Sequence, residues 1–319
     1  MGIKYLNKYL KKECPEAIKQ ITFWEMRRKK IAIDASIYMY RFAMDDGLIE
    51  GMYQLVMLLL YYNIVPVFIF DGKPPTEKKE LLNKRREEKN KAEERHNILL
   101  TKINDTKNGN KKEELYAELD YLKKKFIRLS NEDISNVKYL LTLCGVTYFD
   151  AEGEADELCA KLVIKKRVWA CMSEDMDMFV YGCPRVLRYL SLLNETTILY
   201  DTKAILNKLN LSLQEFREIC ILSGTDYNVL ETRHANLYTT LHYFKKYKNS
   251  SRKTDKFYEW LESNTNYLTD SCKAYSIYYM FDMSNINMKK YYKQRCINSA
   301  INRLELKNFL KNYNFIFIN

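Results

Sequence analysis

Four short apolar runs constrain the fold of this chain more than any other feature of its sequence. They are rich in β-branched and aromatic residues and span Ile31–Ile37, Val65–Phe70, Val146–Phe149 and Val168–Met172. Continuous runs of this length are typical of strands buried on both faces, as in a parallel sheet. Because the segments between them have helical periodicity, the sequence predicts an α/β fold. We expect a central, mostly parallel sheet with helices on both faces.

The segments between the runs predict the helices of this fold. Crossover helices are expected at Leu48–Tyr62, Asp133–Cys144 and Glu154–Lys166, and a later hairpin at Arg185–Leu190 and Thr197–Tyr200. Beyond residue 211 the pattern is helical, with Ser212 as the expected N-cap of a helix over Leu213–Leu222. Residues 76–128 instead form two long charged stretches, broken by residues 104–110, with too few apolar residues for core helices. We expect this segment to project from the sheet as a pair of helices.

Charge is distributed unevenly along the chain, whose net formal charge is +11. Residues 1–30, 73–128 and 241–319 carry net charges of +6, +6 and +8, whereas residues 31–72 and 129–240 carry −4 and −5. A basic periphery around an acidic centre suggests a polyanion bound outside and cations bound inside. Lysine-rich solvated helices would give the same pattern, so charge alone leaves both interpretations open.

Cysteine spacing and apolar content exclude several classes of protein. The eight cysteines include no C-x-x-C pair, which argues against a zinc site or a secreted disulfide framework. The first thirteen residues contain four lysines and no apolar signal-peptide core. The longest apolar stretch, residues 55–70, contains Asn63 and Pro66 and is too short for a membrane span. We therefore expect an intracellular protein without membrane segments.

Acidic residues follow each of the four predicted strands. They are Asp34, with which the first strand ends, Asp71 after the second, Asp150, Glu152 and Glu154 after the third, and Asp175 and Asp177 after the fourth. The carboxyl ends of parallel strands meet at one edge of a sheet, so these carboxylates should share a small volume. Such a cluster repels itself unless cations fill it, and oxygen ligands favour Mg²⁺ or Mn²⁺. Any one of these acids alone could be a helix cap; their coincidence at four strand ends supports a metal site.

Six motifs of the chain occur in the same order in a known family. They are Met1-Gly-Ile-Lys-Tyr5, Ile31-Ala-Ile-Asp-Ala-Ser36, Val67-Phe-Ile-Phe-Asp-Gly-Lys-Pro-Pro75, Glu152-Gly-Glu-Ala155, Ser173-Glu-Asp-Met-Asp177 and Gly224-Thr-Asp-Tyr227. In these residues the chain resembles the flap endonuclease family of structure-specific 5′ nucleases, as a divergent member matching over residues 1–227. The resemblance implies an N-terminal nuclease region (1–98) with the start of a helical arch (about 76–128), an internal nuclease region (129–227) and a helical C-terminal DNA-binding region (228–319).

The resemblance implies a centre of seven carboxylates that holds two Mg²⁺ ions, with Mn²⁺ as a substitute. Asp34, Asp71, Glu152 and Glu154 match the family's first metal group, and Asp175, Asp177 and Asp226 match its second. Three further acids flank the motifs without matching them, and they are interpreted as helix caps or surface acids: Asp150, Asp156 and Glu174.

Other residues match the family's contacts with DNA. Lys78 and Arg85 match two basic catalytic positions; seven residues apart, they would share one helix face and neutralise charge on the scissile phosphate. Tyr40 matches a tyrosine on which the base next to the cut stacks. The other expected DNA contacts are Gly2, Lys4, Lys84, Arg86, Arg188, Lys245 and Lys246. Solvated helix faces, a frayed terminus and a core aromatic are the ordinary alternatives for these residues.

The C-terminal region departs from the family pattern. After Gly-x-Asp-Tyr the family has a glycine-containing hairpin that binds phosphates and a monovalent cation, whereas residues 228–240 contain no glycine and no proline. We therefore expect a degenerate helix-hairpin-helix-like module without a potassium site, in which lysines supply the charge. No sliding-clamp motif is recognisable in the tail, and we expect a monomer.

Together these features predict a Mg²⁺-dependent 5′ flap endonuclease with 5′-to-3′ exonuclease activity, whose partner is branched DNA with a 5′ flap. It would act where DNA is replicated and repaired, whether in a nucleus, an organelle or a viral replication compartment. Two alternatives stay open. One is a related nuclease acting on bubbles, four-way junctions or double-strand ends, and the other is a non-catalytic DNA-binding scaffold of the same fold. The intact acidic motifs argue against the scaffold.

Overall fold

The computed structural model describes residues 2–105, 109–225, 227, 236–250 and 256–317. The chain forms two compact units that interleave along the sequence. The first, here the sheet unit, comprises Met1–Ala35, Met57–Lys73 and Val146–Ser299. The second, here the helical unit, comprises Ser36–Val56, Pro74–Gly145 and Ala300–Asn319.

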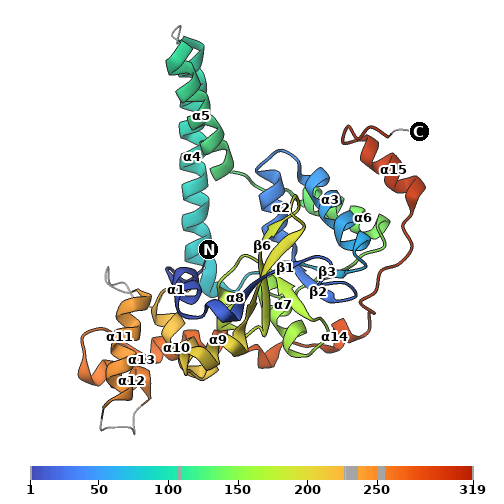
Figure 1. Ribbon diagram of the computed structural model, residues 1–319. Coiled ribbons are helices and arrows are strands. Elements are labelled where there is room, and N and C mark those ends of the chain that lie inside the picture. Colours follow the sequence, from blue (N-terminus) through green and yellow to red (C-terminus); the bar gives the residue numbers. More distant parts are fainter. Residues whose placement is uncertain (1, 106–108, 226, 228–235, 251–255, 318–319) are drawn as a thin grey trace. The chain divides into compact units, whose positions relative to one another are not determined.

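Seven strands form one sheet in the order β1–β7–β6–β5–β2–β3–β4 (Figure 1). Their bounds are β1 (Ile18–Thr22), β2 (Lys30–Asp34), β3 (Val65–Phe70), β4 (Thr147–Asp150), β5 (Ala170–Met172), β6 (Arg185–Ser191) and β7 (Thr196–Asp201). The strands from β6 to β4 are parallel to their neighbours, whereas β7 runs antiparallel to both β6 and β1. The predicted mostly parallel sheet of an α/β protein is confirmed, and so is the predicted β6–β7 hairpin.

Two details of the sheet differ from the sequence-based prediction. The apolar run Ile31–Ile37 is strand only in its first half: β2 ends at Asp34, as the position of this acid predicts, and helix α2 (Ala35–Ala43) begins directly after it. An apolar run does not distinguish a buried strand from the buried first turn of a helix. The structure also contains β1, an edge strand in which only Ile21 is fully buried. Its sequence therefore shows no apolar run.

The sheet unit also contains helices. They are α1 (Leu6–Glu13), α7 (Ala155–Ile164), α8 (Asp177–Val180), α9 (Thr202–Leu209), α10 (Leu213–Leu222), α11 (Leu237–Lys248), α12 (Phe257–Asn264), α13 (Ser271–Met280) and α14 (Lys289–Tyr292), with 3₁₀ turns η1 (Pro15–Ala17) and η3 (Met283–Asn285). Helix α7 packs on β2, β3 and β5. The predicted cap of α10 is confirmed: the Ser212 hydroxyl accepts the Glu215 N–H, and the Glu215 carboxylate accepts the Ser212 N–H.

Long charged helices dominate the helical unit. Its elements are α2, the first part of α3 (Leu48–Tyr61), η2 (Thr76–Lys78), α4 (Lys79–Asp105), α5 (Gly109–Lys125), α6 (Asn131–Leu143) and α15 (Arg303–Lys311). Helices α4 and α5 pack side by side as a hairpin (Figure 1), which confirms the two helices predicted between residues 76 and 128. A small core joins them: Ala92, Leu99, Ile103, Leu119 and Leu122. Within the described residues, no helix is both long and apolar enough to cross a bilayer.

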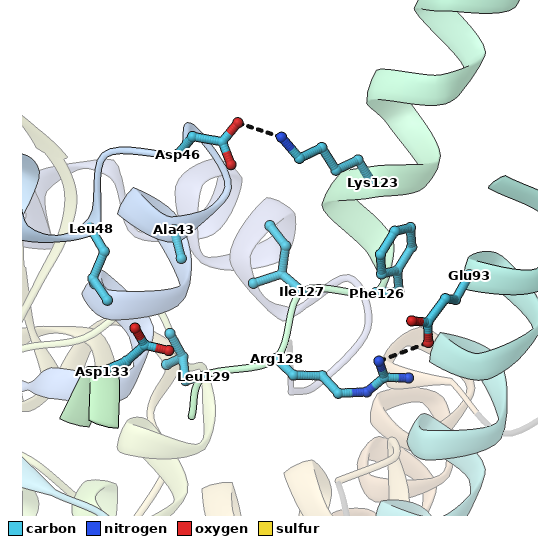
Figure 2. A pocket seen from close by; sticks show the side chains of 10 residues that line it. All are labelled: Ala43, Asp46, Leu48, Glu93, Lys123, Phe126, Ile127, Arg128, Leu129 and Asp133. Carbon is cyan, nitrogen blue, oxygen red and sulfur yellow. Dashed lines mark hydrogen bonds and ion pairs between the residues drawn. The ribbon is translucent and has the colours of Figure 1, made fainter. Parts of the chain in front are cut away.

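A pocket of about 420 Å³ lies where the α4–α5 hairpin meets the rest of the helical unit (Figure 2). Its walls include the apolar segment after α5 and the loop between α2 and α3. Two ion pairs frame it, Lys123 with Asp46 and Arg128 with Glu93. Exposed ion pairs contribute only about 0–1 kcal/mol each, so they hold the base of the hairpin weakly.

Candidate metal centre

Strand order gathers the predicted carboxylates at one edge of the sheet. Strands β5, β2, β3 and β4 are consecutive and parallel, so their carboxyl ends lie side by side. Six predicted ligands stand at or just after these ends: Asp34 (β2), Asp71 (β3), Glu152 and Glu154 (β4), and Asp175 and Asp177 (β5). The seventh predicted ligand, Asp226, lies outside the described residues. The parallel topology thus brings together acids that are more than 140 residues apart in the chain.

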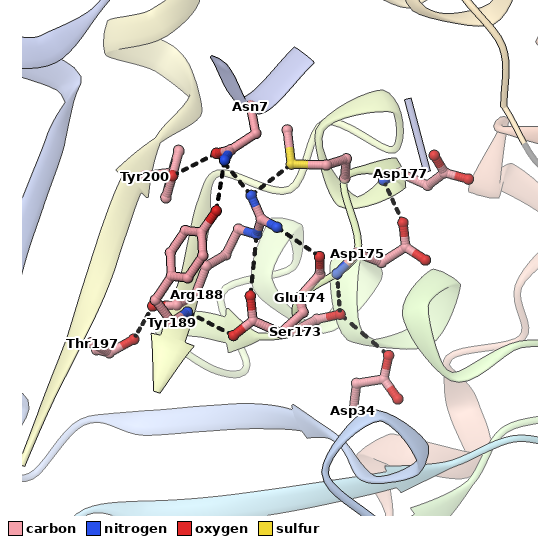
Figure 3. Close-up of polar contacts among 11 residues, drawn as sticks. Asn7, Asp34, Ser173, Glu174, Asp175, Asp177, Arg188, Tyr189, Thr197 and Tyr200 are labelled. Atoms are coloured by element: carbon pink, nitrogen blue, oxygen red, sulfur yellow. Dashed lines mark hydrogen bonds and ion pairs between the residues drawn. The ribbon is translucent and has the colours of Figure 1, made fainter. Parts of the chain in front are cut away.

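One buried serine links the Asp34 carboxylate, after β2, to the backbone of Asp175, after β5 (Figure 3). The Ser173 hydroxyl donates a hydrogen bond of 3.2 Å to Asp34 Oδ2 and accepts the Asp175 N–H at 3.2 Å. The Asp177 N–H then donates to Asp175 Oδ1 at 3.0 Å. Asp34 and Asp177 are only 6% and 2% exposed. Buried carboxylates are costly unless hydrogen bonds or cations compensate them, so these positions favour a cation.

A glycine allows the segments after β3 and β4 to approach closely. The Gly72 N–H donates to the Gly153 carbonyl at 2.7 Å, and a side chain at residue 72 would place its Cβ 2.1 Å from a backbone oxygen. Next to this contact, the Ala155 N–H donates to Asp71 Oδ1 at 2.9 Å. The sequence Asp71-Gly72 is therefore a steric requirement for bringing Asp71 next to Glu154.

The N-terminus lies against the carboxylates that follow β5. Gly2 has a φ of +77°, and a side chain there would place its Cβ 2.8 Å from Asp175 Oδ1 and 3.0 Å from Asp177 Oδ1. Glycine is the residue that tolerates both this backbone conformation and this proximity. Lys4, two residues on, is exposed. The predicted DNA contact Gly2 is therefore adjacent to the candidate metal ligands Asp175 and Asp177.

Two tyrosines, Tyr227 and Tyr181, lie beside the carboxylates of this edge. The Tyr227 hydroxyl donates to Glu154 Oε2 at 3.0 Å. Burial raises the pKa of Tyr227 strongly, and the negative charges of Glu154, Asp156 and Asp177 raise it further. Burial likewise raises the pKa of Tyr181 well above its ordinary value, with contributions from Asp156 and Glu154. A field that disfavours a phenolate favours a cation.

The donor set fits hard divalent cations. Every candidate ligand offers carboxylate oxygens, which suit Mg²⁺ and Mn²⁺ rather than softer metals. Among the residues that the structure describes, no three Asp, Glu, His or Cys side chains stand close enough to enclose one ion. The ligand assignment stays a prediction that the chemistry of the donors supports.

A buried arginine holds the segment that carries two of these carboxylates (Figure 3). Arg188, on β6, is 7% exposed. Its guanidinium donates to the Glu174 carbonyl at 2.9 Å and to Asn7 Oδ1 at 3.0 Å, and Nε lies 3.6 Å from Glu174 Oε2. It also contacts the Met176 sulfur. Arg188 therefore connects α1 to the loop that contains Asp175.

Sequence reasoning missed the partners of this arginine. Glu174, interpreted from the sequence as a cap or surface acid, accepts the Tyr189 N–H at 2.6 Å and forms the ion pair with Arg188. Asn7 donates to the Tyr189 hydroxyl at 2.6 Å and accepts the Tyr200 hydroxyl at 2.8 Å. These pairs are more than 180 residues apart, and no local pattern marks them. The contact of Arg188 with DNA stays a prediction. In the structure its guanidinium binds Asn7 and Glu174.

The predicted basic residues of the helical unit lie at the start of the α4–α5 hairpin. Lys78 ends the 3₁₀ turn η2 and is 6% exposed, so it precedes the long helix rather than sharing it with Arg85. Arg85 is partly buried on α4, whereas Lys84 and Arg86 are exposed. The side chains of Arg85 and of its two basic neighbours therefore differ in exposure, and their roles stay predictions.

Lys89 lies beside the predicted residue Tyr40 within the helical unit. Its ammonium lies 4.8 Å from the centre of the Tyr40 ring and donates to the Ile127 carbonyl at 2.8 Å. Burial lowers the pKa of Lys89, and the positive charges of Arg128 and Arg85 lower it further. In the sheet unit, Lys245 and Lys246 are both exposed near the C-terminal end of α11.

Two sequence families match the chain. The XPG N-terminal domain matches residues 1–92, and the XPG I-region matches residues 145–226. Together the two regions cover more than half of the chain. They include all the candidate metal ligands, with Asp226 as the last matched residue.

Curated relatives are flap endonucleases. Flap endonuclease 1 of Zea mays is 34% identical over 246 residues, which cover 71% of this chain and 62% of that protein. Flap endonuclease 1 of Candida tropicalis is 33% identical over 248 residues, covering 71% of this chain and 63% of that protein. The matched part of this chain thus spans somewhat less than two thirds of these relatives.

Solved structures share the fold over nearly the whole chain. The catalytic core of Rad2 in complex with a DNA substrate has a TM-score of 0.68 at 18% identity, covering 98% of this chain and 94% of that chain. Flap endonuclease-1 from Methanococcus jannaschii has a TM-score of 0.63 at 24% identity, covering 99% and 94%. At these identities the likeness establishes the fold.

Proposed function

Because this chain belongs to the flap endonuclease family of XPG nucleases, we propose that it is a structure-specific nuclease that cuts DNA at 5′ flaps. The single observation that supports this most is the convergence of six acids at the carboxyl ends of β5, β2, β3 and β4. Hydrolysis of a phosphodiester near a single-strand/double-strand junction would leave a 5′ phosphate and a 3′ hydroxyl. Removal of 5′ nucleotides from ends would be the accompanying exonuclease activity.

The carboxylates would hold two divalent cations, Mg²⁺ or Mn²⁺. Asp34, Asp71, Glu152 and Glu154 would form one set of ligands, and Asp175 and Asp177, with Asp226, the other. Bound there, the cations would supply Lewis-acid activation of the attacking water and of the scissile phosphate. Ser173 would orient Asp34 and the Asp175 backbone through its hydrogen bonds of 3.2 Å. Outer-shell partners of this kind fix the direction in which ligand oxygens point.

Basic and aromatic residues of the helical unit would handle the substrate. Lys78 and Arg85 would neutralise the negative charge that develops on the phosphate, the guanidinium through two parallel hydrogen bonds. Tyr40 would stack on the base next to the cut, with Lys89 beside its ring. Exposed Lys84 and Arg86 would bind the backbone without regard to sequence.

Binding of the remaining DNA would rest on exposed cations of the sheet unit. Lys4 near the N-terminus and Lys245 and Lys246 on α11 are exposed and would contact phosphates. The proposal gives the protein a role in DNA replication and repair, at the places where flaps arise.

The test of this proposal is cleavage of a panel of labelled DNAs: flap, nicked, gapped, bubble and four-way. We expect 5′ flap DNA to be cut fastest, in Mg²⁺ or Mn²⁺ and not in EDTA. Faster cutting of bubbles or four-way junctions would assign the chain to a related specificity. Tight DNA binding without cleavage in any divalent metal would overturn the nuclease proposal.

A further inference from the structure

Two exposed tyrosines from distant parts of the sequence form a pair on the sheet unit. Tyr5 precedes α1 and is 45% exposed, and Tyr238 lies in the first turn of α11 and is 47% exposed. Their ring centroids are 6.0 Å apart and the rings are tilted by 45°. Tyr9 also contacts Tyr238, edge-on, with the ring centroids 6.2 Å apart. Aromatic rings that contact one another and still expose half their surface can accept another flat group.

The backbone of Tyr5 is strained. It has φ +68° and ψ −9°, a left-handed conformation that glycine adopts without cost and a bulky residue does not. A non-glycine residue persists there when its surroundings hold it, and such outliers cluster at functional sites. Nothing in the start of α1 requires a tyrosine, because Leu6 and Leu10 supply its buried face. The left-handed conformation of Tyr5 therefore supports a functional role for its exposed ring.

The pair lies close to the candidate metal ligands. Gly2, three residues before Tyr5, abuts Asp175 and Asp177 at the distances given above. The Lys4 ammonium lies 5.2 Å from the centre of the Tyr5 ring, so a cation accompanies the aromatic surface. A short chain of residues thus leads from the carboxylates to the rings.

The face of α11 that carries Tyr238 continues as a polar and basic stripe. His242 and Lys245 follow at four and seven residues, which places all three on one side of the helix, and both are exposed. Lys245 is one of the predicted phosphate contacts. The tyrosine pair therefore lies between the candidate metal centre and a cationic face of α11.

We propose that Tyr5 and Tyr238 form a stacking platform for an unpaired nucleobase of the DNA substrate, an inference that rests on the proposed nuclease function. Exposed rings flanked by cations suit the two parts of a nucleotide, the flat base and the anionic phosphate. A platform next to the metal ligands would hold an unpaired base near the scissile bond, other than the base on which Tyr40 would stack. A partner protein could bind the same surface only through a segment with acidic and aromatic residues. Removing single bases from the DNA distinguishes a nucleobase from such a protein as the ligand.

Paired changes in protein and DNA test the proposal. The probe is a 5′-flap DNA in which each nucleotide around the junction is replaced in turn by an abasic residue, with binding measured in Ca²⁺. The variants are Tyr238→Ala and Tyr5→Gly, with Tyr5→Phe and Tyr238→Phe keeping the rings. Tyr5→Gly removes the ring at a position where glycine relieves strain, so its melting temperature should equal or exceed that of the wild type. Tyr139→Ala is the matched control, because Tyr139 is 46% exposed and also contacts one aromatic ring, Phe309, at 5.3 Å.

At one DNA position, base removal should weaken wild-type binding roughly 5- to 150-fold. The same removal should have little further effect on Tyr238→Ala or Tyr5→Gly, because ring and base form one contact. The phenylalanine variants and Tyr139→Ala should bind like the wild type. If base removal and ring removal are additive at every position, the platform does not exist. A different outcome is that base removal and ring removal are non-additive at one position but the wild type does not cut flap DNA. That result would refute the proposed nuclease function and would still support the stacking platform.

Discussion

Replacing Arg188 by methionine tests whether the protein positions its candidate metal ligands through a buried clamp. Methionine keeps much of the side-chain volume and removes the guanidinium. The change deletes the hydrogen bonds to Asn7 and to the Glu174 carbonyl, and the ion pair with the Glu174 carboxylate. The loop that carries Asp175 would then lose its connection to α1.

The size of the effect follows from burial. Removing one partner of a fully buried ion pair costs about 3–5 kcal/mol, and hydrogen bonds to charged groups contribute about 1.5–3 kcal/mol each. The Glu174 side chain is 27% exposed and keeps its bond from the Tyr189 N–H, so the cost here should be lower. We expect a loss of about 2–3 kcal/mol of stability. Release of the loop that carries Asp175 should also weaken metal binding, by about the 10- to 100-fold that loss of a ligand's hydrogen-bond partner costs.

The assay is single-turnover cleavage of flap DNA as a function of Mg²⁺ concentration. Arg188→Met should need about 10- to 100-fold more Mg²⁺ for half-maximal rate and should approach the wild-type rate at saturation. Arg185→Met is the matched control, since Arg185 lies on the same strand, partly buried, and contacts the Trp169 carbonyl at 3.5 Å instead of the ligand loop. An unchanged Mg²⁺ requirement in a folded Arg188→Met protein would refute the reasoning.

Three further predictions concern other parts of the chain. Arg85→Ala should lower the single-turnover rate on pre-bound flap DNA more than it lowers the affinity for DNA. Arg86→Ala, which changes the exposed neighbour, should lower the affinity alone. Equal rate constants for Arg85→Ala and the wild type would contradict the catalytic role of Arg85. Exchange of Na⁺ for K⁺ at constant ionic strength should change the affinity for duplex DNA little, and a clear preference for K⁺ would show an intact cation-binding hairpin. Replacing both Lys245 and Lys246 by alanine should reduce the slope of log affinity against log salt concentration by up to about two units. Burial raises the pKa of Glu218, so this carboxyl holds its proton more tightly in the folded state than in the unfolded state. The free energy of unfolding should therefore fall as the pH rises from the pKa of the unfolded state through that of the folded state. Glu218→Gln should therefore raise the melting temperature at about pH 7 and not at about pH 4, and an equal change at both would contradict this.

The sequence predicts the strand ends well because buried parallel strands leave a strong local signal. The apolar runs locate β2, β3, β4 and β5, and the acids after them stand at one sheet edge as expected. The limit of this signal is visible at Ala35, where an apolar run continues while the chain turns from strand to helix. Burial alone does not encode that turn.

What the sequence does not predict depends on contacts between distant residues. Strand β1 pairs with β7 through residues about 180 positions apart, and its mostly exposed side chains give no apolar run. The Glu174–Arg188–Asn7 network has the same character, since each partner looks like an ordinary polar surface residue on its own. Steric facts such as the closeness of Gly2 to Asp175 likewise emerge only when the chain is folded.

The central claim is that carboxylates at this sheet edge bind the divalent cations of a nuclease. Counting bound Mn²⁺ by electron paramagnetic resonance, in the complex with flap DNA, tests it most directly. The wild type should bind two tight Mn²⁺ ions per chain, and Asp175→Ala should lose one of them while still binding DNA. Asp150→Ala, which changes an acid at the end of β4 outside the predicted ligand set, should keep both. An unchanged Mn²⁺ count and affinity in Asp175→Ala would contradict the account.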